Sequence, residues 1–286
     1  MNDTAESPVL LCCDLDRTLL PNGPEPESPA ARPLLRRLAQ HPRLLLAYVS
    51  GRDLGLLQSA IEEYRLPLPD YAVGDVGTTI YAQAGGRWQP WSQWGEVIGA
   101  DWRGNDGRSV AAALAGIDGL RLQEAGKQNT WKVSFYAEPA QRQTLLAEVE
   151  RRLAALGVEA RLIWSIDDLT HEGLLDVLPA SASKLHAIEF LIAQLGLPPF
   201  QVVFAGDSGN DLPVLTSGLQ AVLVRNARPE VREEALAGAF ARGNGDTLYL
   251  AQGGLLGMNG NYAAGVIEGL LHFCPACREW LPREAD

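Results

Sequence analysis

Basic residues are scarce in this 286-residue chain. Lysine and arginine together number 24 against 35 aspartate and glutamate residues, which gives a formal net charge of −11 at pH 7. A field of that sign repels the phosphate backbone of nucleic acids and anionic lipid surfaces. The composition therefore argues against a nucleic-acid or membrane-surface partner.

The chain also lacks any run of the ~20 apolar residues that a membrane-spanning helix requires. Its first residues, MNDTAESPV, contain two acids and no apolar stretch, unlike a secretory signal. With 47% hydrophobic and 21% charged residues, the composition is that of a globular chain long enough for one large or two modest cores. These features predict a cytoplasmic protein.

Cysteine is rare as well, with four in the chain. Cys12 and Cys13 are adjacent in an apolar run, where neighbouring side chains point to opposite faces of a strand and do not bridge easily. Cys274 and Cys277 form a CPAC tetrad, a spacing found in redox pairs and in half of a zinc site. Because no second CxxC or histidine pair accompanies the tetrad, free thiols on a terminal turn are favoured.

What the chain does contain is an alternation of branched apolar runs with segments of helical period. This pattern is typical of βαβ units around a parallel sheet, so the predicted fold class is α/β. Asp53 and Ser183 are predicted N-caps of two of the helices, and Gly196 ends the second. The predicted strands span Val9 to Cys13, Leu44 to Val49, Gln201 to Ala205 and Ala221 to Val224.

The middle of the chain has a different character, with a helical period around Leu145 and Val149 and an alternating strand around Val133. Tryptophans gather here, and those at 88, 91 and 94 have the spacing of one helical face. That spacing is typical of packing, although the same rings are able to stack on a sugar. We predict a core domain in two parts, residues 1–80 and 175–286, with an inserted α/β domain at 81–174.

The strongest chemical signal is the pair Asp14 and Asp16, which follows the first predicted strand directly. Open α/β sheets bind ligands at the carboxyl ends of their strands. Two carboxylates so close together resist joint ionisation unless a cation or a shared proton offsets their charge. Oxygen ligands suit a hard ion such as Mg²⁺, but an ordinary polar turn explains this motif equally well when it is taken alone.

Two further elements lie at helix starts. Ser50, Gly51 and Arg52 connect the second strand to its helix, where a hydroxyl and free backbone N–H groups make a phosphate cradle. Lys184 begins the helix after Ser183 and supplies a point charge suited to a phosphoryl group. Taken alone, an ordinary turn and a solvated surface lysine are the simpler explanations.

The fourth element is the loop GDSGND at residues 206–211, which follows the third strand. Its glycines let the backbone approach an ion or a phosphate, and Asp207 and Asp211 supply oxygens to a metal or to a nearby lysine. A turn rich in Asp and Asn explains one such loop. Four elements at successive strand ends are hard to explain in that way, so together they predict catalysis.

In their order, the DxDxT motif at 14–18, Ser50, Lys184 and the GDSGND loop resemble the four motifs of the haloacid dehalogenase (HAD) superfamily of phosphotransferases. The insertion before Lys184 is similar to the class IIB cap of the branch that contains the sucrose-phosphate phosphatases. Ser50 departs from the pattern, since Thr is common there. The segments that support the resemblance are VGTTIY at 76–81, NTWKVS at 129–134, DVLP at 176–179, VRNA at 224–227 and YAAGVIEGL at 262–270.

The resemblance implies a Rossmann-like HAD core with a C2-type α/β cap, and a role for each motif residue. Asp14 is the implied nucleophile, which forms an aspartyl-phosphate, and Asp16 the general acid and base. Asp14, Asp207 and the backbone carbonyl of Asp16 are the implied ligands of Mg²⁺. Ser50 and Lys184 are counted as catalytic because they take up phosphoryl charge. The residues implied to bind phosphate or to support the site are Gly51, Arg52, Asn210 and Asp211.

Substrate selection is expected in the inserted domain, because the core motifs touch only phosphate. Lys132 is implied to reach the hydroxyl groups of a sugar, and Gln128 and Asn129 are hydrogen-bonding candidates. The alternative for Lys132 is the solvent face of an alternating strand.

The function implied is Mg²⁺-dependent hydrolysis of a sugar phosphate, first sucrose 6-phosphate and next mannosylfructose phosphate or another glycosyl phosphate. A phosphomannomutase-like phosphotransferase and a catalytically silent sugar-phosphate-binding partner of a synthase are the alternatives. A silent partner tends to lose catalytic carboxylates, and all four aspartates of the motifs are present, which favours an enzyme. The expected partners are the sugar-phosphate substrate and a separate sugar-phosphate synthase.

Overall fold

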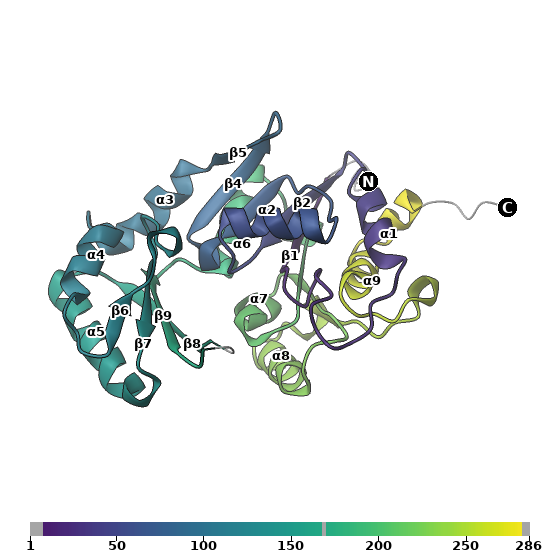
Figure 1. Ribbon diagram of the computed structural model, residues 1–286. Coiled ribbons are helices and arrows are strands. Elements are labelled where there is room, and N and C mark those ends of the chain that lie inside the picture. Colours follow the sequence, from purple (N-terminus) through teal and green to yellow (C-terminus); the bar gives the residue numbers. More distant parts are fainter. Residues whose placement is uncertain (1–7, 168–169, 282–286) are drawn as a thin grey trace.

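Two β-sheets form the framework of the protein, seen in a computed structural model that describes residues 8–167 and 170–281 (Figure 1). The larger sheet has eight strands in the order β12-β11-β10-β1-β2-β3-β4-β5. Its strands from β12 to β3 run parallel, and β4 and β5 add an antiparallel edge. These strands are β1 Val9–Cys13, β2 Leu44–Val49, β3 Tyr71–Gly74, β4 Thr79–Ala84, β5 Arg87–Pro90, β10 Val202–Gly206, β11 Gln220–Leu223 and β12 Leu248–Leu250.

Four antiparallel strands form the smaller sheet, in the order β6-β7-β9-β8, which we call the cap sheet. Figure 1 shows it beside the larger sheet, with helices α4 and α5 on its outer side. The chain leaves the larger sheet after β5 and returns to it after β9. The division at residues 81 and 174 stays a prediction. The strands are β6 Leu120–Leu122, β7 Val133–Ala137, β8 Ala160–Ile166 and β9 Gly173–Pro179.

Helices cover both faces of the larger sheet, as parallel strands require. Side chains of α1, α2 and α9 share one apolar core with the sheet, and those of α3, α6, α7 and α8 share the other. A third core joins α4 and α5 to the cap sheet. The helices are α1 Ala31–Leu38, α2 Leu54–Glu63, α3 Ser92–Gly99, α4 Gly107–Leu114, α5 Arg142–Leu156, α6 Lys184–Leu195, α7 Leu212–Leu215, α8 Pro229–Ala241 and α9 Ala263–Phe273.

Most of the predicted elements are present, and the α/β class is confirmed. The first two strands match their predicted bounds, and the other two are shifted by one residue. Asp53 and Ser183 cap α2 and α6 by accepting hydrogen bonds from backbone N–H groups, and Gly196 ends α6 with a left-handed conformation (φ 63°). Local sequence signals therefore place the strand ends that carry the chemical motifs.

The prediction of one helical face for the three tryptophans is wrong. Trp88 lies in β5, Trp91 precedes α3, and only Trp94 is in the helix, because the hairpin of β4 and β5 continues as far as Pro90. Trp91 and Trp94 pack against the ring of Phe190, with ring centroids 5.6 and 5.2 Å away, so packing explains these two.

The four cysteines are free, and Cys12 and Cys13 are fully buried in β1 as predicted. Within residues 8–167 and 170–281, no helix has both the length and the apolar character needed to cross a lipid bilayer. The first seven residues, which carry most of the argument against a secretory signal, lie outside the described residues.

Candidate active site

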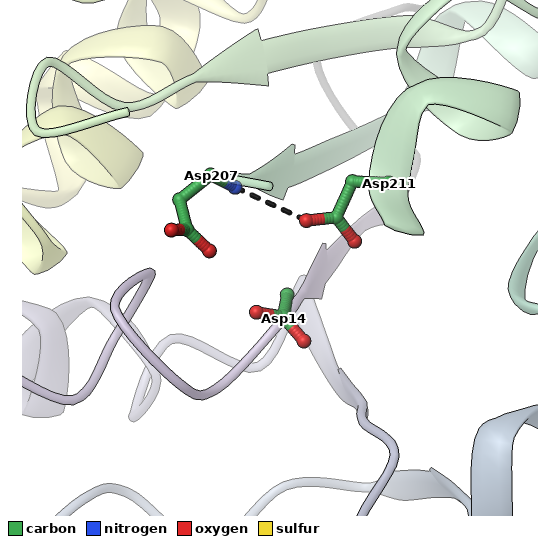
Figure 2. A group of neighbouring side chains, drawn as sticks. All are labelled: Asp14, Asp207 and Asp211. Carbon is green, nitrogen blue, oxygen red and sulfur yellow. Dashed lines mark hydrogen bonds between the residues drawn. The ribbon is translucent and has the colours of Figure 1, made fainter. Parts of the chain in front are cut away.

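Three aspartates from two segments meet at the carboxyl edge of the larger sheet (Figure 2). Asp14 follows β1, and Asp207 and Asp211 follow β10. The two strands pair in parallel with Cys13 opposite Ala205, so the residues after them emerge together. One oxygen from each carboxylate lies within 4.8 Å of the others, and all three residues are buried. The sequence places these residues at strand ends, and the parallel pairing brings them together.

Lys184 joins this cluster from the first position of α6. Its ammonium donates to Asp14 Oδ1 at 2.7 Å, to Asp211 Oδ1 at 2.8 Å and to Asn210 Oδ1 at 3.2 Å. Three acceptors match the three protons of an ammonium group. Lys184 is 5% exposed, so the explanation of a solvated surface lysine is wrong.

Asp211 fastens the loop that carries Asp207. Its Oδ2 accepts hydrogen bonds from the backbone N–H groups of Asp207 and Ser208, both at 3.1 Å. The carboxylate also lies against Gly206, where an added Cβ would approach Asp211 Cγ to 2.6 Å. Only glycine permits this approach, which accounts for the first residue of the GDSGND loop.

Burial and mutual repulsion make the cluster a strongly negative site. Burial raises the pKa of Asp14 to about 7, with Lys184 opposing the rise and Asp211 and Asp207 adding to it. Burial and Asp211 raise the pKa of Asp207 to about 6. Burial also disfavours the charge of Lys184, but Asp14 and Asp211 outweigh it and raise the pKa of the ammonium. The carboxylates thus carry more negative charge than the protein's own cations offset.

Asp16 lies outside this buried cluster, with 44% of its side chain exposed. Arg52 binds it with two hydrogen bonds, from Nε at 2.8 Å and from Nη2 at 2.6 Å, and Asn22 donates a third at 2.7 Å. Burial opposes the charge of Asp16, yet these bonds and the charge of Arg52 lower its pKa. Asp16 is therefore held ionised in this conformation.

The turn after β2 brings the predicted phosphate cradle to the same edge. Ser50 is buried, and its hydroxyl accepts the backbone N–H of Arg52 at 3.2 Å. Gly51 is exposed, and an added Cβ would meet no atom closer than 3.9 Å. Close packing therefore does not require glycine at position 51.

Thr18 has a place in the site that the motif alone did not indicate. Its buried hydroxyl lies 3.2 Å from Asp14 Oδ2 and 3.2 Å from Asp207 Oδ1, so it connects the two strand ends. A threonine four residues after an aspartate carries no periodic signal of such a contact. Only the pairing of β1 with β10 creates it.

Lys132, directly before β7 of the cap sheet, is buried, with 7% exposure. Its ammonium forms an ion pair at 2.7 Å with Asp75, which directly follows β3 of the larger sheet. The alternative prediction of a solvent-facing lysine on an alternating strand is therefore wrong, because Lys132 precedes the strand and meets a carboxylate. Asp75 was not singled out from the sequence.

Gln128 and Asn129 both contribute to the fold around Lys132. The amide of Gln128 donates to the carbonyls of Gln123 and Ser134, and its oxygen accepts the N–H of Ser134. Asn129 donates to Thr78 Oγ1 at 3.1 Å and accepts the N–H of Trp131.

A cavity of about 580 Å³ opens beside these residues, and we call it the cap pocket. It is large enough for a small molecule. Its lining consists of Asp106, Gly107, Arg108, Ala111, Leu122, Gln123, Ala125, Gln128, Asn129, Thr130, Lys132 and Val133.

Short contacts link the cap pocket to the larger sheet. Lys132 lines the pocket and pairs with Asp75, whose N–H donates to the carbonyl of Arg52 at 2.9 Å. Arg52 in turn binds Asp16. Polar contacts thus connect Lys132 to Asp16.

Comparisons with known proteins agree with this arrangement. A family model described as sucrose-6F-phosphate phosphohydrolase matches residues 7–274. A protein of Nitrosococcus oceani, named only as a HAD-like hydrolase, is 54% identical over 274 residues, which cover 96% of this chain and 74% of that protein. The mannosylfructose-phosphate phosphatase of Agrobacterium fabrum is 32% identical over 224 residues, which cover 78% of this chain and 85% of that protein.

A solved structure is similar along nearly its whole length. The sucrose-phosphatase of Synechocystis sp. PCC6803, in complex with sucrose and phosphate, superposes with a TM-score of 0.67. Its sequence is 26% identical, and the match covers 94% of this chain and 98% of that one. The resemblance drawn from the motifs is confirmed.

Proposed function

Because this chain belongs to the sucrose-6F-phosphate phosphohydrolase family of HAD-like phosphatases, we propose that it hydrolyses sucrose 6-phosphate to sucrose and inorganic phosphate. Membership of the family makes the chain a phosphoric monoester hydrolase. The observation that carries the proposal is the meeting of Asp14, Lys184 and Asp207 at one sheet edge in a chain matched by the family along residues 7–274.

Asp14 is the proposed nucleophile. One of its carboxylate oxygens bonds to phosphorus while the ester bond to the sugar oxygen breaks, which leaves an aspartyl-phosphate. Water then attacks this intermediate, releases inorganic phosphate and restores the carboxylate. Lys184 lies 2.7 Å from Asp14, and we propose that it takes up charge on the phosphoryl oxygens during both steps.

The donor set at the sheet edge fits Mg²⁺. Two carboxylates with raised pKa values indicate negative charge that a divalent ion would offset, and hard oxygen donors are the ligands that this ion prefers. Asp14, Asp207 and the carbonyl of Asp16 would hold it, while Asp211 is committed to Lys184 and to its own loop. When bound, the ion would neutralise charge that develops on the phosphoryl group.

Asp16 is the proposed general acid and base, a role that requires a proton at the moment the sugar departs. Its pairing with Arg52 opposes protonation. We propose that Arg52 turns to the phosphoryl oxygens when substrate enters, because a dianionic phosphate competes for the same guanidinium. The pKa of Asp16 then rises, so that its carboxylate takes up a proton from solvent and passes it to the leaving oxygen of the sugar. In the second step the Asp16 carboxylate accepts the proton that the attacking water gives up.

The sugar is proposed to lie between the sheet edge and the cap pocket. Lys132 lines that pocket, and its ion pair with Asp75 connects through Arg52 to Asp16. An ammonium with one carboxylate partner retains protons for hydroxyl groups. Gln128 and Asn129 are proposed to shape the pocket wall beside it.

Mannosylfructose phosphate is the second candidate substrate. The phosphatase of that name from Agrobacterium fabrum is 32% identical to this chain, against 26% for the sucrose-phosphatase structure. Both names denote phosphatases of phosphorylated disaccharides, so the two candidates share a reaction and differ in the sugar.

The test measures inorganic phosphate released from a panel of sugar phosphates, with Mg²⁺ and with chelator. We expect sucrose 6-phosphate or mannosylfructose phosphate to be hydrolysed fastest, and chelator to remove the activity. Stoichiometric release of phosphate distinguishes hydrolysis from transfer to a second sugar. Equal, slow release from every member of the panel would contradict the disaccharide assignment.

Asp14→Asn supplies the control for the panel. The amide has nearly the same shape but is a poor nucleophile, so turnover should fall by at least about 10⁴-fold while the fold is kept. Wild-type rates from a folded Asp14→Asn protein would remove Asp14 from its assigned role. A separate sugar-phosphate synthase remains a proposed partner, and its co-elution with this protein is the corresponding test.

A further inference from the structure

The turn between Asp16 and Thr18 has an unusual backbone. Arg17 has a φ of 61°, in the left-handed region that residues with a side chain seldom adopt. Such a residue persists only where its surroundings hold both sides of the turn. The N–H of Arg17 donates to Asn22 Oδ1 at 2.8 Å, which fixes one side.

Asn226 fixes the other side. Its Nδ2 donates to the carbonyl of Arg17 at 2.6 Å, across 209 positions of sequence. Asn226 follows β11 and is 4% exposed, and it belongs to the VRNA segment, to which the sequence reasoning assigned no role. A buried amide that satisfies one distant carbonyl acts as a specific constraint on that peptide.

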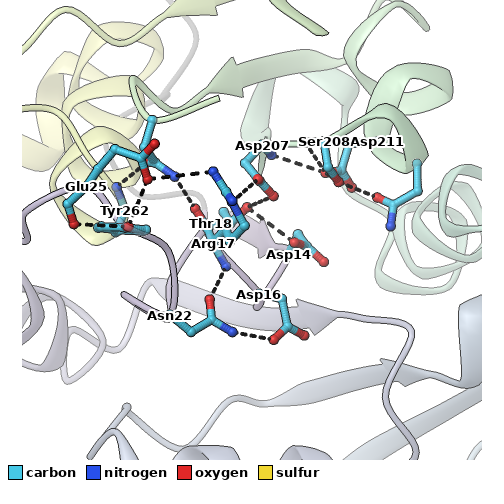
Figure 3. Close-up of polar contacts among 12 residues, drawn as sticks. Asp14, Asp16, Arg17, Thr18, Asn22, Glu25, Asp207, Ser208, Asp211 and Tyr262 are labelled. Atoms are coloured by element: carbon cyan, nitrogen blue, oxygen red, sulfur yellow. Dashed lines mark hydrogen bonds and ion pairs between the residues drawn. The ribbon is translucent and has the colours of Figure 1, made fainter. Parts of the chain in front are cut away.

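The remaining polar atom of Asn226 is anchored as well. Its Oδ1 accepts the N–H of Tyr262 at 2.8 Å, and the Tyr262 hydroxyl bonds to Glu25 in the loop beyond Arg17. Figure 3 shows Tyr262 and Glu25 on one side of Arg17, with Asp207 on the other. The side-chain amide of Asn226 is therefore fixed at both ends: its oxygen is bonded to Tyr262 and its nitrogen to the Arg17 carbonyl.

This position matters because Arg17 lies between two groups of the site. Asp16 precedes it, and Thr18, whose hydroxyl bridges Asp14 and Asp207, follows it. Because the hydroxyl bonds of Thr18 hold that residue in place, a rotation of the peptide that carries the Arg17 carbonyl is taken up on the side of Asp16. We propose that Asn226 is a positioning residue, which sets the direction of the Asp16 carboxylate by fixing the Arg17 carbonyl. The proposal rests on the general acid role proposed for Asp16.

A purely structural role is the competing explanation, and the chain offers a matched control for it. Asn261 is also a buried asparagine, 8% exposed, and its Nδ2 donates to the carbonyl of Pro26 in the same loop at 3.0 Å. Its bond lies beyond Glu25 rather than beside Asp16. Loss of the Asn261 side chain loosens the loop without releasing the Arg17 peptide.

The test compares two leaving groups. A sugar alkoxide needs a proton from Asp16 in order to depart, whereas the p-nitrophenolate of p-nitrophenyl phosphate departs without one. We expect Asn226→Ala to lower kcat by about 10- to 100-fold on the sugar phosphate hydrolysed fastest by the wild type, and by less than about threefold on p-nitrophenyl phosphate. Asn261→Ala should change both rates by the same small factor.

A second variant removes the hydrogen bond from Asn226 to the Arg17 carbonyl and keeps the one from Tyr262 to Asn226. Asn226→Asp has almost the same shape and keeps an acceptor for Tyr262, but it has no donor for the Arg17 carbonyl. It should reproduce the dependence on leaving group that Asn226→Ala shows, and it keeps the test available if the alanine variant does not fold. Failure of both variants to fold while Asn261→Ala folds would assign Asn226 a structural role and overturn the proposal.

Equal losses on both substrates in the Asn226 variants would also overturn it. Asp16→Asn, measured in parallel, separates this outcome from a failure of the proposed function. If Asp16→Asn shows no dependence on the leaving group, the general acid assignment is wrong. If Asp16→Asn shows the dependence and the Asn226 variants do not, only the positioning role is wrong.

Discussion

Lys184, at the start of α6, and Lys132, directly before β7 of the cap sheet, are similar in burial and in ion pairing. They are 5% and 7% exposed, and each ammonium lies 2.7 Å from an aspartate. Their partners differ. Lys184 contacts three acceptors, one of which is the proposed nucleophile, whereas among the described residues the structure gives the ammonium of Lys132 one carboxylate, Asp75.

Burial and ion pairing alone therefore do not define the role of a lysine. All three protons of Lys184 are committed to groups that follow β1 and β10, so it is fixed beside the carboxylate proposed to attack the phosphoryl group. Lys132 borders the cap pocket, and Asp75, its only carboxylate partner among the described residues, lies in the turn that follows β3 of the larger sheet. We infer that the first lysine serves the phosphoryl group of every substrate and the second serves the sugar.

The largest effect that would test this contrast is expected from Lys184→Met. Loss of the charge beside Asp14 should lower kcat by about 10²- to 10³-fold, on sugar phosphate and on p-nitrophenyl phosphate alike, because both carry the same phosphoryl group. Steady-state kinetics on the two substrates measures it. Lys184→Arg, which keeps the charge, should lose less.

Lys184→Met should also lower stability, since Asp14 and Asp211 would be left buried without their cation. Removing one partner of a buried pair costs about 3–5 kcal/mol. Chemical unfolding of the metal-free protein gives this value. If Lys184→Met spares turnover of p-nitrophenyl phosphate, the phosphoryl role of Lys184 is wrong.

A smaller and more selective effect is expected from Lys132→Met. If the ammonium contacts the sugar, KM for sucrose 6-phosphate should rise by about tenfold, while KM for p-nitrophenyl phosphate changes by less than about twofold. The ratio of the two KM values is the quantity to measure. A uniform change on both substrates would erase the contrast between the two lysines.

Asp75→Asn is the matched control for this prediction. It removes the ion pair but leaves the ammonium in place, so it should raise KM for the sugar phosphate less than Lys132→Met does. If the two variants lose the same stability and the same affinity, Lys132 serves only to join the two sheets.

Sequence reasoning succeeded for the region around Lys184. Asp14 and Asp207 each follow an apolar strand, and Ser183 caps the helix that Lys184 begins, so local patterns place all three at one edge. The parallel pairing of β1 with β10 then brings these residues together, because it aligns the ends of neighbouring strands. The burial of Lys184 follows from that convergence.

The region around Lys132 was less predictable for a physical reason. Asp75 and Val76 have φ values of 51° and 60°, a left-handed stretch between β3 and β4 that no periodicity reveals. The contact with Lys132 then joins two residues that lie 57 positions apart in the sequence. The same holds for Asn226 and Arg17, whose pairing depends on where distant loops meet rather than on any local preference.

The last effect is the smallest and concerns Mg²⁺ and pH. The pKa of Asp14 is raised to about 7, and that of Asp207 to about 6, against about 3.9 for an aspartate in the unfolded chain. The folded protein therefore binds these protons more tightly than the unfolded chain. Their contribution to stability is complete below about pH 4 and is lost as the pH rises through about 6 and 7.

Mg²⁺ competes with those protons, so its stabilising effect should grow over the same range. In chelator, Tm should fall between about pH 5 and about pH 8, and saturating Mg²⁺ should restore several degrees at the upper end and little at the lower end. Lys132→Met should keep this difference, because Asp75 lies outside the cluster of three aspartates. An equal shift at both pH values would mean that Mg²⁺ binds somewhere other than at Asp14 and Asp207.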